Sequence, residues 1–527
     1  MKPETRTHSG SSVQACQNCK KNFTIEPEDF NFYEKIKVPS PTFCPECRMI
    51  RRMMWRNERD FSKVKCNAPK HDEFILSSFN SIGKYKIYDQ KYWWSDEWDP
   101  MQYGQDYYFS NPFFLQFKEL FESVPHDNVI VRNNVNSNYT NWSINNKNCY
   151  LSFGILSCEN VMYSANRIFN SRDSMDLFFV DKLESSYEDI NCQNSFCLFF
   201  SNNCNSCLNS YFLYDCKNCS NCIACVGLRN KQYYIFNKPY SKKEYGLELN
   251  KLNFGSYNFI SKMKEDFKKF KILYPHKYAN IISAENSTGD YLINVKNCKN
   301  CFDFMSDSEN CKYIFRGGPH TKDGYDCFNN SSNNELSYEG VSISQSTSNV
   351  VCSVALWTGV NMSYSYYCHN CKNCFGCIGL RGKQFCILNK QYTKEQYEEL
   401  IPKIIKQMND LPYISPRKNP KTGEGQVYQY GEFFPPELSP FCYNETIAQE
   451  YFPLTKEEAL RQGYRWKERE ERNYTIDIKN EALPDDIKDI TTTIVGKVIE
   501  CNHKGTCNEQ CTEAFKIIPE ELSFYQR

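Results

Sequence analysis

The chain has 527 residues, enough for several domains and a large buried core. Its 63 Lys and Arg residues balance 63 Asp and Glu residues, so no net charge draws it to nucleic acid or an anionic membrane. No apolar run reaches the ~20 residues that a membrane-spanning helix needs. A content of 24% charged and 15% aromatic residues excludes a disordered chain.

The 29 cysteines bear on the compartment and on the chemistry. Residues 1–14 are polar and lack the apolar segment of a secretory signal. Without export the cysteines are expected to stay reduced, so CxxC pairs indicate metal or redox chemistry rather than disulfides. We therefore expect a cytoplasmic protein that makes no contact with a membrane.

Two CxxC pairs near the N-terminus predict a zinc site formed by Cys16, Cys19, Cys44 and Cys47. Two thiolates at this spacing chelate one ion from a tight turn, and two pairs complete a tetrahedral four-thiolate site. We expect the first pair on a hairpin. Because Pro45 suits a first helical turn, we expect a helix to begin at the second pair.

The run Cys16-x2-Cys19-x3-Phe23 … Phe32-Tyr33 … Pro41-x2-Cys44-Pro45-x-Cys47-Arg48 resembles the probable treble-clef zinc-ribbon family of bacterial proteins, which has no established activity. The resemblance covers about 45 residues and implies a zinc-binding treble clef, within a module predicted over residues 1–66.

The helix after the second pair carries four arginines and a tryptophan within one arc: Arg48, Arg52, Trp55, Arg56 and Arg59. Arginine interleaved with an aromatic ring suits phosphate contacts and base stacking, so this face is a candidate surface for RNA or DNA. The alternative is that the arginines pair with acidic residues of a neighbouring domain, residues 96–99 being a candidate.

Residues 67–124 predict an aromatic-rich cap followed by a helix. Tyrosines and tryptophans between 85 and 108 lack helical spacing and indicate irregular packing. Asn111 and Pro112 start a helical pattern that runs over 112–123.

Residues 125–273 and 274–411 form an internal duplication with an offset of about 150 residues, since several motifs recur in the same order. Short apolar runs between Asn, Asp and Ser corners, with starts 12 residues apart, predict a β-solenoid. Capping boxes at Ser241 and Thr393 predict helices over 242–252 and 394–408 that cap the open solenoid ends, and 257–270 is a further candidate helix.

Each repeat closes on a ladder of four cysteines at steps of three: Cys216, Cys219, Cys222 and Cys225, then Cys368, Cys371, Cys374 and Cys377. A step of three fits neither a helix face nor a strand face, so we expect these cysteines in turns. Three readings stay open: packed thiols at coil corners, bound zinc, or an iron–sulfur cluster.

Residues 412–490 predict a Pro- and Gly-rich extended linker over 412–440 and a helix near 456. Residues 491–527 repeat part of the N-terminal pattern. They predict a partial second zinc ribbon with Cys501, Cys507 and Cys511 as candidate ligands, and Cys501 or His503 could supply the ligand that is otherwise missing.

The fold class expected is mainly β with helical caps, a duplicated solenoid core flanked by small treble-clef modules. No catalytic constellation stands out. The leading functional hypothesis is a cytoplasmic zinc-binding scaffold that contacts RNA, DNA or protein partners. Its rivals are an iron–sulfur redox protein and a β-helical carbohydrate-active enzyme.

Overall fold

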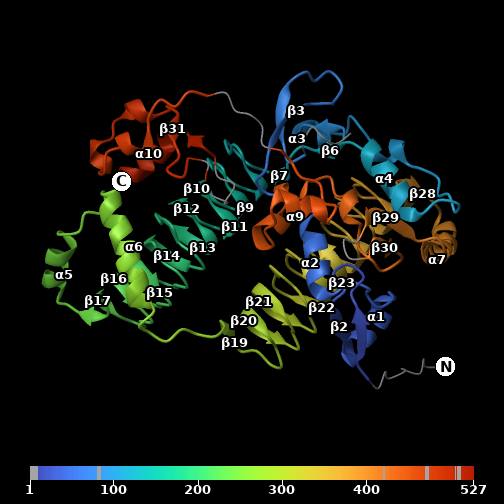
Figure 1. Ribbon diagram of the computed structural model, residues 1–527, viewed down its shortest axis with the longest axis horizontal. Coiled ribbons are helices and arrows are strands. Elements are labelled where there is room, and N and C mark those ends of the chain that lie inside the picture. Colours follow the sequence, from blue (N-terminus) through green and yellow to red (C-terminus); the bar gives the residue numbers. More distant parts are fainter. Residues whose placement is uncertain (1–9, 80–84, 419–421, 469–473, 505, 507–511) are drawn as a thin grey trace. The chain divides into compact units, whose positions relative to one another are not determined.

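The computed structural model describes residues 10–79, 85–418, 422–468, 474–504, 506 and 512–527 (Figure 1). The chain divides into two compact units. The first comprises Met1–Val129 and Lys277–Glu468, and the second comprises Ile130–His276 and Arg469–Arg527. Each unit contains one of the two repeats together with one end of the chain.

The second unit contains a β-solenoid whose short strands pair in parallel from one coil to the next. Paired residues lie 12 apart over most of it, as in Phe196↔Leu208 and Leu208↔Ser220. The final pair, β17 with β18, is antiparallel. The strands are β7 (Val131–Arg132), β8 (Asn141–Ile144), β9 (Phe153–Leu156), β10 (Glu159–Met162), β11 (Ala165–Phe169), β12 (Arg172–Met175), β13 (Phe178–Glu184), β14 (Gln193–Phe199), β15 (Leu208–Tyr214), β16 (Ser220–Val226), β17 (Gln232–Ile235) and β18 (Lys238–Pro239).

The first unit contains a second parallel β-solenoid, which confirms the predicted fold class. Its early coils advance by 13 residues, as in Tyr325↔Tyr338, and its later coils by 12, as in Cys374↔Cys386. The strands are β19 (Ile281–Ile282), β20 (Gly289–Lys296), β21 (Cys301–Glu309), β22 (Thr321–Phe328), β23 (Asn334–Val341), β24 (Ser348–Val351), β25 (Val360–Ser363), β26 (Lys372–Phe375), β27 (Gln384–Ile387) and β28 (Lys390–Gln391).

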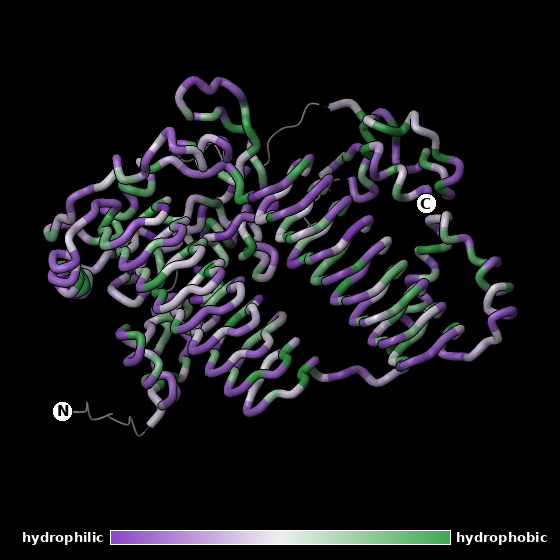
Figure 2. The backbone as a smooth tube through the Cα atoms, turned by 180° about the vertical axis from the view of Figure 1, so that it is seen from behind, coloured by the Kyte–Doolittle hydropathy of each residue, from purple (hydrophilic) through white to green (hydrophobic). Residues whose placement is uncertain are grey.

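A three-residue backbone unit explains the cysteine spacing. Along one coil, every third residue has a positive φ and forms a corner: Glu188, Asn191, Asn194 and Cys197. The residue after each corner points inward and is at most 4% exposed: Asp189, Cys192, Ser195 and Leu198. Four sides of three residues make a 12-residue coil, so hydrophobic and hydrophilic residues follow one another at short intervals (Figure 2).

Inward serines and cysteines satisfy backbone groups as well as filling space. The Ser195 hydroxyl donates to the Gln193 carbonyl at 2.8 Å and accepts from the backbone N–H of Cys207, one coil later, at 3.1 Å. Outward asparagines stack in the same way, the Asn148 amide bonding the Asn160 side chain at 3.1 Å. Small polar residues therefore suit this interior because a buried N–H must find an acceptor.

The predicted helices are present. The capping boxes at Ser241 and Thr393 start α5 (Lys242–Leu249) and α7 (Lys394–Asp410), which contact the last parallel strands, β17 and β27. Helix α6 (Tyr257–Lys271) instead runs along the side of its solenoid against β15 and β16 (Figure 1).

The rest of the first unit packs around its solenoid. Predicted helix 112–123 is α4 (Phe113–Ser123), and Trp93 of the aromatic segment is fully buried. The elements are β1 (Ser12–Ala15), β2 (Asn22–Ile25), α1 (Pro27–Ile36), α2 (Pro45–Met53), β3 (Ser62–Lys65), β4 (Phe74–Ser77), β5 (Ile87–Tyr88), α3 (Gln90–Trp93), η1 (Pro100–Tyr103) and β6 (His126–Asp127).

The extended linker predicted over 412–440 is wrong. This segment forms an antiparallel hairpin, β29 (Tyr413–Lys418) with β30 (Gly425–Tyr428), and then buries Phe433 and Phe434 completely. The prolines of this segment prevent helix formation, but they do not make the segment an exposed linker. The aromatic residues between them are apolar and are buried. The later elements are η2 (Pro436–Leu438), η3 (Tyr443–Glu445), α8 (Ile447–Tyr451) and α9 (Lys456–Arg461), the last at the predicted position.

The C-terminal segment belongs to the second unit. Its elements are η4 (Asn480–Ala482), η5 (Ile487–Asp489), η6 (Thr492–Ile494), β31 (Ile499–Glu500), β32 (Ala514–Phe515) and α10 (Pro519–Tyr525). In the described ranges, every helix is too short or too polar to span a bilayer.

Candidate metal centre

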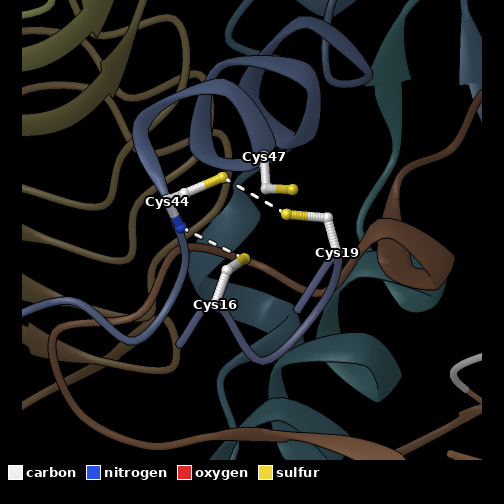
Figure 3. Close-up of side chains that lie close together, drawn as sticks. All are labelled: Cys16, Cys19, Cys44 and Cys47. Carbon is white, nitrogen blue, oxygen red and sulfur yellow. Dashed lines mark hydrogen bonds between the residues drawn. The ribbon is translucent and has the colours of Figure 1, made fainter. Parts of the chain in front are cut away.

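Two loops bring four cysteines together in the first unit. Cys16 and Cys19 lie in the connection of the β1–β2 hairpin, as predicted. Cys44 is the N-cap of α2 and Cys47 lies in its first turn, directly after Pro45 at the first helical position. Figure 3 shows the four sulfurs pointing toward one another from these two loops.

The sulfurs have the spacing of a metal site. All four lie within 4.8 Å of one another, and Cys19 Sγ is 3.7 Å from Cys44 Sγ. Sulfurs that surround one zinc ion at ~2.3 Å lie ~3.8 Å apart in a tetrahedron. Cys16 is completely buried and Cys44 and Cys47 are at most 8% exposed, so the group is closed to solvent on most sides.

Hydrogen bonds around the sulfurs favour thiolates. The backbone N–H of Cys44 donates to Cys16 Sγ at 3.2 Å, and the Asn18 amide donates to Cys47 Sγ at 3.3 Å. Hydrogen bonds from Cys44 and Cys47 lower the pKa of Cys16, whereas the bond with Cys16 raises the pKa of Cys44 to about 12. One thiolate is thus stabilised by its neighbours, and further thiolates require a cation among them.

The donor set fits a structural metal ion. Four protein sulfurs fill a tetrahedral site and leave no position for water or substrate, which is the arrangement of structural rather than catalytic zinc. The N-terminus of α2 adds favourable electrostatics, because two of the sulfurs belong to its N-cap and first turn.

The predicted outward basic face of the helix is wrong, and the helix α2 ends at Met53, so that Trp55, Arg56 and Arg59 lie beyond it. Arg48, Arg52 and Arg56 are at most 2% exposed, and Trp55 packs 4.8 Å from the ring of Phe434. Buried side chains cannot reach a nucleic acid in this structure. Arg59 alone of the predicted set is substantially exposed, and it pairs with Glu450 at 3.1 Å.

The arginines pair with carboxylates of the solenoid instead of with residues 96–99. Arg48 Nη2 lies 2.9 Å from Asp326 Oδ2, and Glu339 accepts from both Arg51 and Arg52, at 2.7 and 2.6 Å. Asp326 and Glu339 occupy corners of adjacent coils on β22 and β23. Two stacked carboxylates would repel one another, so the guanidinium groups of α2 complement them.

This network continues beyond α2. Arg51 also contacts Glu432 at 2.9 Å, and Glu58 accepts from Arg56 and from Arg316, the latter at 3.2 Å. No local pattern in the sequence reveals these partners, because they lie up to 381 residues from the arginines they bind. The sequence signal that could have indicated burial is the density of arginine in a short helix that also carries a face of methionines.

The ladder cysteines pack inside the solenoids. All eight are at most 1% exposed. Cys222, Cys225 and Cys374 lie within strands, which corrects the expectation of turns for these three, whereas the other five lie between strands. Because the three-residue unit turns the chain at each corner, residues that are three positions apart all point inward. Each thiol lies near backbone carbonyl groups. Cys216 Sγ, for example, is 3.5 Å from the carbonyl oxygen of Tyr214 and 3.6 Å from that of Cys225.

Within the described part of the chain, two clusters bring three or more metal-ligating atoms together, and neither contains a ladder cysteine. One is the four-cysteine group. The other, formed by Cys66, His71, Glu73 and Asp89, was not foreseen from the sequence. The arrangement of the ladders therefore favours the packing interpretation over zinc or iron–sulfur.

The predicted second ribbon has a matching backbone but untested ligands. The hairpin β31–β32 and α10 with its initial Pro519 parallel the hairpin β1–β2 and α1 with its initial Pro27. Cys501 is partly exposed, while Cys507 and Cys511 lie outside the described residues. The metal site at this end stays a prediction.

No protein-family model and no curated protein matches the chain. The resemblance to the treble-clef zinc-ribbon family therefore remains an expectation from the N-terminal motif.

Proposed function

We propose that the protein is a cytoplasmic zinc-binding scaffold, in which one zinc ion held by Cys16, Cys19, Cys44 and Cys47 closes a treble-clef module. The observation that carries the proposal is the convergence of four thiols on the N-terminus of the helix whose arginines dock on the solenoid. Zinc would fix the direction of α2 and so align its arginines with the solenoid carboxylates.

The two solenoids support a scaffold role. Solenoids offer long, rigid surfaces that suit the binding of macromolecular partners. The proposal leaves the partner as protein or nucleic acid, with contact surfaces other than the buried arginines of α2.

The test is the metal content of the purified full chain, measured by mass spectrometry, for wild type and for Cys16→Ser with Cys44→Ser. The double variant should lose one zinc ion per chain. It should also melt more than about 5 °C lower, because binding to the folded state alone adds to stability. Protease cleavage should then begin within residues 10–56.

The matched control is Cys207→Ser with Cys219→Ser in the solenoid. Serine already fills an equivalent inward position one coil earlier, at Ser195. The control should keep the wild-type zinc content. Equal zinc in wild type and in the Cys16 and Cys44 variant would contradict the proposal, as would iron with a broad visible absorption band.

A further inference from the structure

A second cluster of metal-ligating side chains lies in the first unit, on elements that the four-cysteine group does not use. Cys66 directly follows strand β3, and His71 and Glu73 lie in the connection from β3 to β4. Asp89 is the N-cap of α3. One ligand atom of each residue lies within 4.8 Å of those of the other three.

The geometry brings several anionic groups to one nitrogen. His71 Nδ1 is 2.7 Å from Glu73 Oε1 and 3.3 Å from Asp89 Oδ2, and the same Asp89 oxygen lies 3.9 Å from Cys66 Sγ. A ring nitrogen carries one proton and donates one good hydrogen bond. Two carboxylates and a thiol therefore converge around His71, and a divalent cation placed among the four groups would bind them all at once.

The backbone holds these groups in place. The Cys66 N–H donates to the Glu73 carbonyl at 3.0 Å, and the Asp89 N–H donates to Cys66 Sγ at 3.4 Å. Asn67 bonds Ile87 through both its N–H and its side-chain oxygen, each at 2.8 Å. The two segments that supply ligands are thus joined by bonds that do not depend on the ligands themselves.

Neighbouring contacts also orient two of the ligands. Asp89 Oδ1 accepts from the backbone N–H groups of Lys91 and Tyr92, at 3.0 and 3.2 Å, which directs its other oxygen toward His71 and Cys66. The His71 ring packs edge-on against Tyr92 with centroids 5.3 Å apart. Such supporting bonds are what fixes the direction of ligands in metal sites.

We propose that Cys66, His71, Glu73 and Asp89 bind a second divalent transition-metal ion, for which zinc is the best match. A thiolate and an imidazole select zinc over magnesium and calcium, and carboxylate oxygens complete a tetrahedral set. Cys66 is 2% exposed and forms the floor of the site, whereas the Glu73 side chain is 51% exposed at its rim. A chelator should therefore reach this ion before the one in the buried four-cysteine group.

The proposal is independent of the proposed function and is tested on the full chain by zinc content after dialysis. Wild type should hold one zinc ion more than His71→Ala and one more than Asp89→Asn. Asparagine keeps the oxygen that caps α3 but removes the charge that binds metal. Asp99→Asn is the matched control, since Asp99 caps η1 in the same way through the Met101 N–H. His320→Ala is the control for the loss of an exposed imidazole.

Cobalt added to the metal-free protein gives a second readout. Cys66→Ser should remove part of the thiolate-to-cobalt absorption, and Cys16→Ser with Cys44→Ser should remove the larger part. Cys442→Ser, a buried cysteine outside both groups, should remove none.

The inference is overturned if His71→Ala and Asp89→Asn both retain the wild-type zinc content. In that case His71 forms an ion pair with Glu73 and nothing more. If those variants lose one ion while Cys16→Ser with Cys44→Ser loses none, the second site stands and the proposed function fails. His71 is partly exposed, so its replacement should leave the fold intact, and an unchanged melting temperature in chelator would verify this.

Discussion

In each solenoid, corner residues of successive coils stack in a column, and the same column is covered by different kinds of side chain in the two units. Ser186-Tyr187-Glu188 and Ser337-Tyr338-Glu339 occupy matching places, and both glutamates are corner residues with a φ of about 50°. In the first unit this column is covered by the arginines of α2, which bind Asp326 and Glu339. In the second unit the same column continues through Phe200 and Phe212, and α6 covers it mainly with apolar side chains.

The difference shows which positions the coil constrains. Inward residues are restricted to small or aliphatic side chains because they must fill a narrow interior and satisfy backbone N–H groups. Corner residues point outward and need only tolerate a positive φ. One coil design can therefore carry a charged docking surface in one repeat and an apolar one in the other.

The largest expected effect comes from Glu339→Ala, which leaves the buried guanidinium groups of Arg51 and Arg52 without their shared carboxylate. Breaking a buried ion pair on one side costs about 3–5 kcal/mol. The matched change, Glu188→Ala, removes a pair with Lys264 whose side chains are 34% and 43% exposed, and should cost less than about 1 kcal/mol. Chemical denaturation of both variants measures the difference, and equal losses would contradict the comparison.

The next effect concerns the apolar cover. Phe212 is 1% exposed and stacks on Phe200 with ring centroids 4.7 Å apart, under Phe267 of α6. Phe212→Ala should destabilise the second unit by about 3 kcal/mol through lost burial and a new cavity. Phe196→Ala, at a side chain 41% exposed, is the control and should cost clearly less. Similar unfolding midpoints for the two variants would argue against α6 as a packed cover.

The smallest effect is expected at Asp176, and its sign is opposite to that of the larger loss expected at Asp326. Burial raises the pKa of Asp176 to about 7, because no cation compensates fully for it, whereas Asp326 binds Arg48 at 2.9 Å. A raised folded-state pKa means stability that is present below about pH 4 and is lost as pH rises to about 7. Asp176→Asn should therefore stabilise the protein by about 1 to 2 kcal/mol at pH 8 and have little effect at pH 4.

Asp326→Asn should instead destabilise at pH 8, because it weakens a buried pair. Denaturation of both variants at the two pH values provides the measurement. A pH-independent effect at Asp176 would show that its carboxyl stays charged in the folded protein.

The sequence predicted the solenoid well because its signals are local and repeated. Capping boxes at Ser241 and Thr393, corner asparagines and the 12-residue spacing all depend on the conformation of neighbouring backbone. Two CxxC pairs likewise indicate a four-cysteine metal site from their spacing alone. The burial of Arg48 and Arg52 could not be predicted in this way. The sequence pattern of a basic helical face is the same whether the face is exposed to solvent or buried in an ion-pair network. The carboxylate partners of Arg52 also lie more than 270 residues away in the sequence.

The inward cysteines also provide a way to follow the unfolding of each solenoid, because a buried thiol becomes reactive only when its coil opens. Among the described cysteines, Cys19, Cys197 and Cys501 are partly exposed and the rest are buried. An alkylating reagent should therefore modify few thiols in the native protein. Coils of a solenoid contact mainly their neighbours and can open one after another from an end. The order in which thiols become alkylated during mild denaturation would then record, coil by coil, where each solenoid opens first.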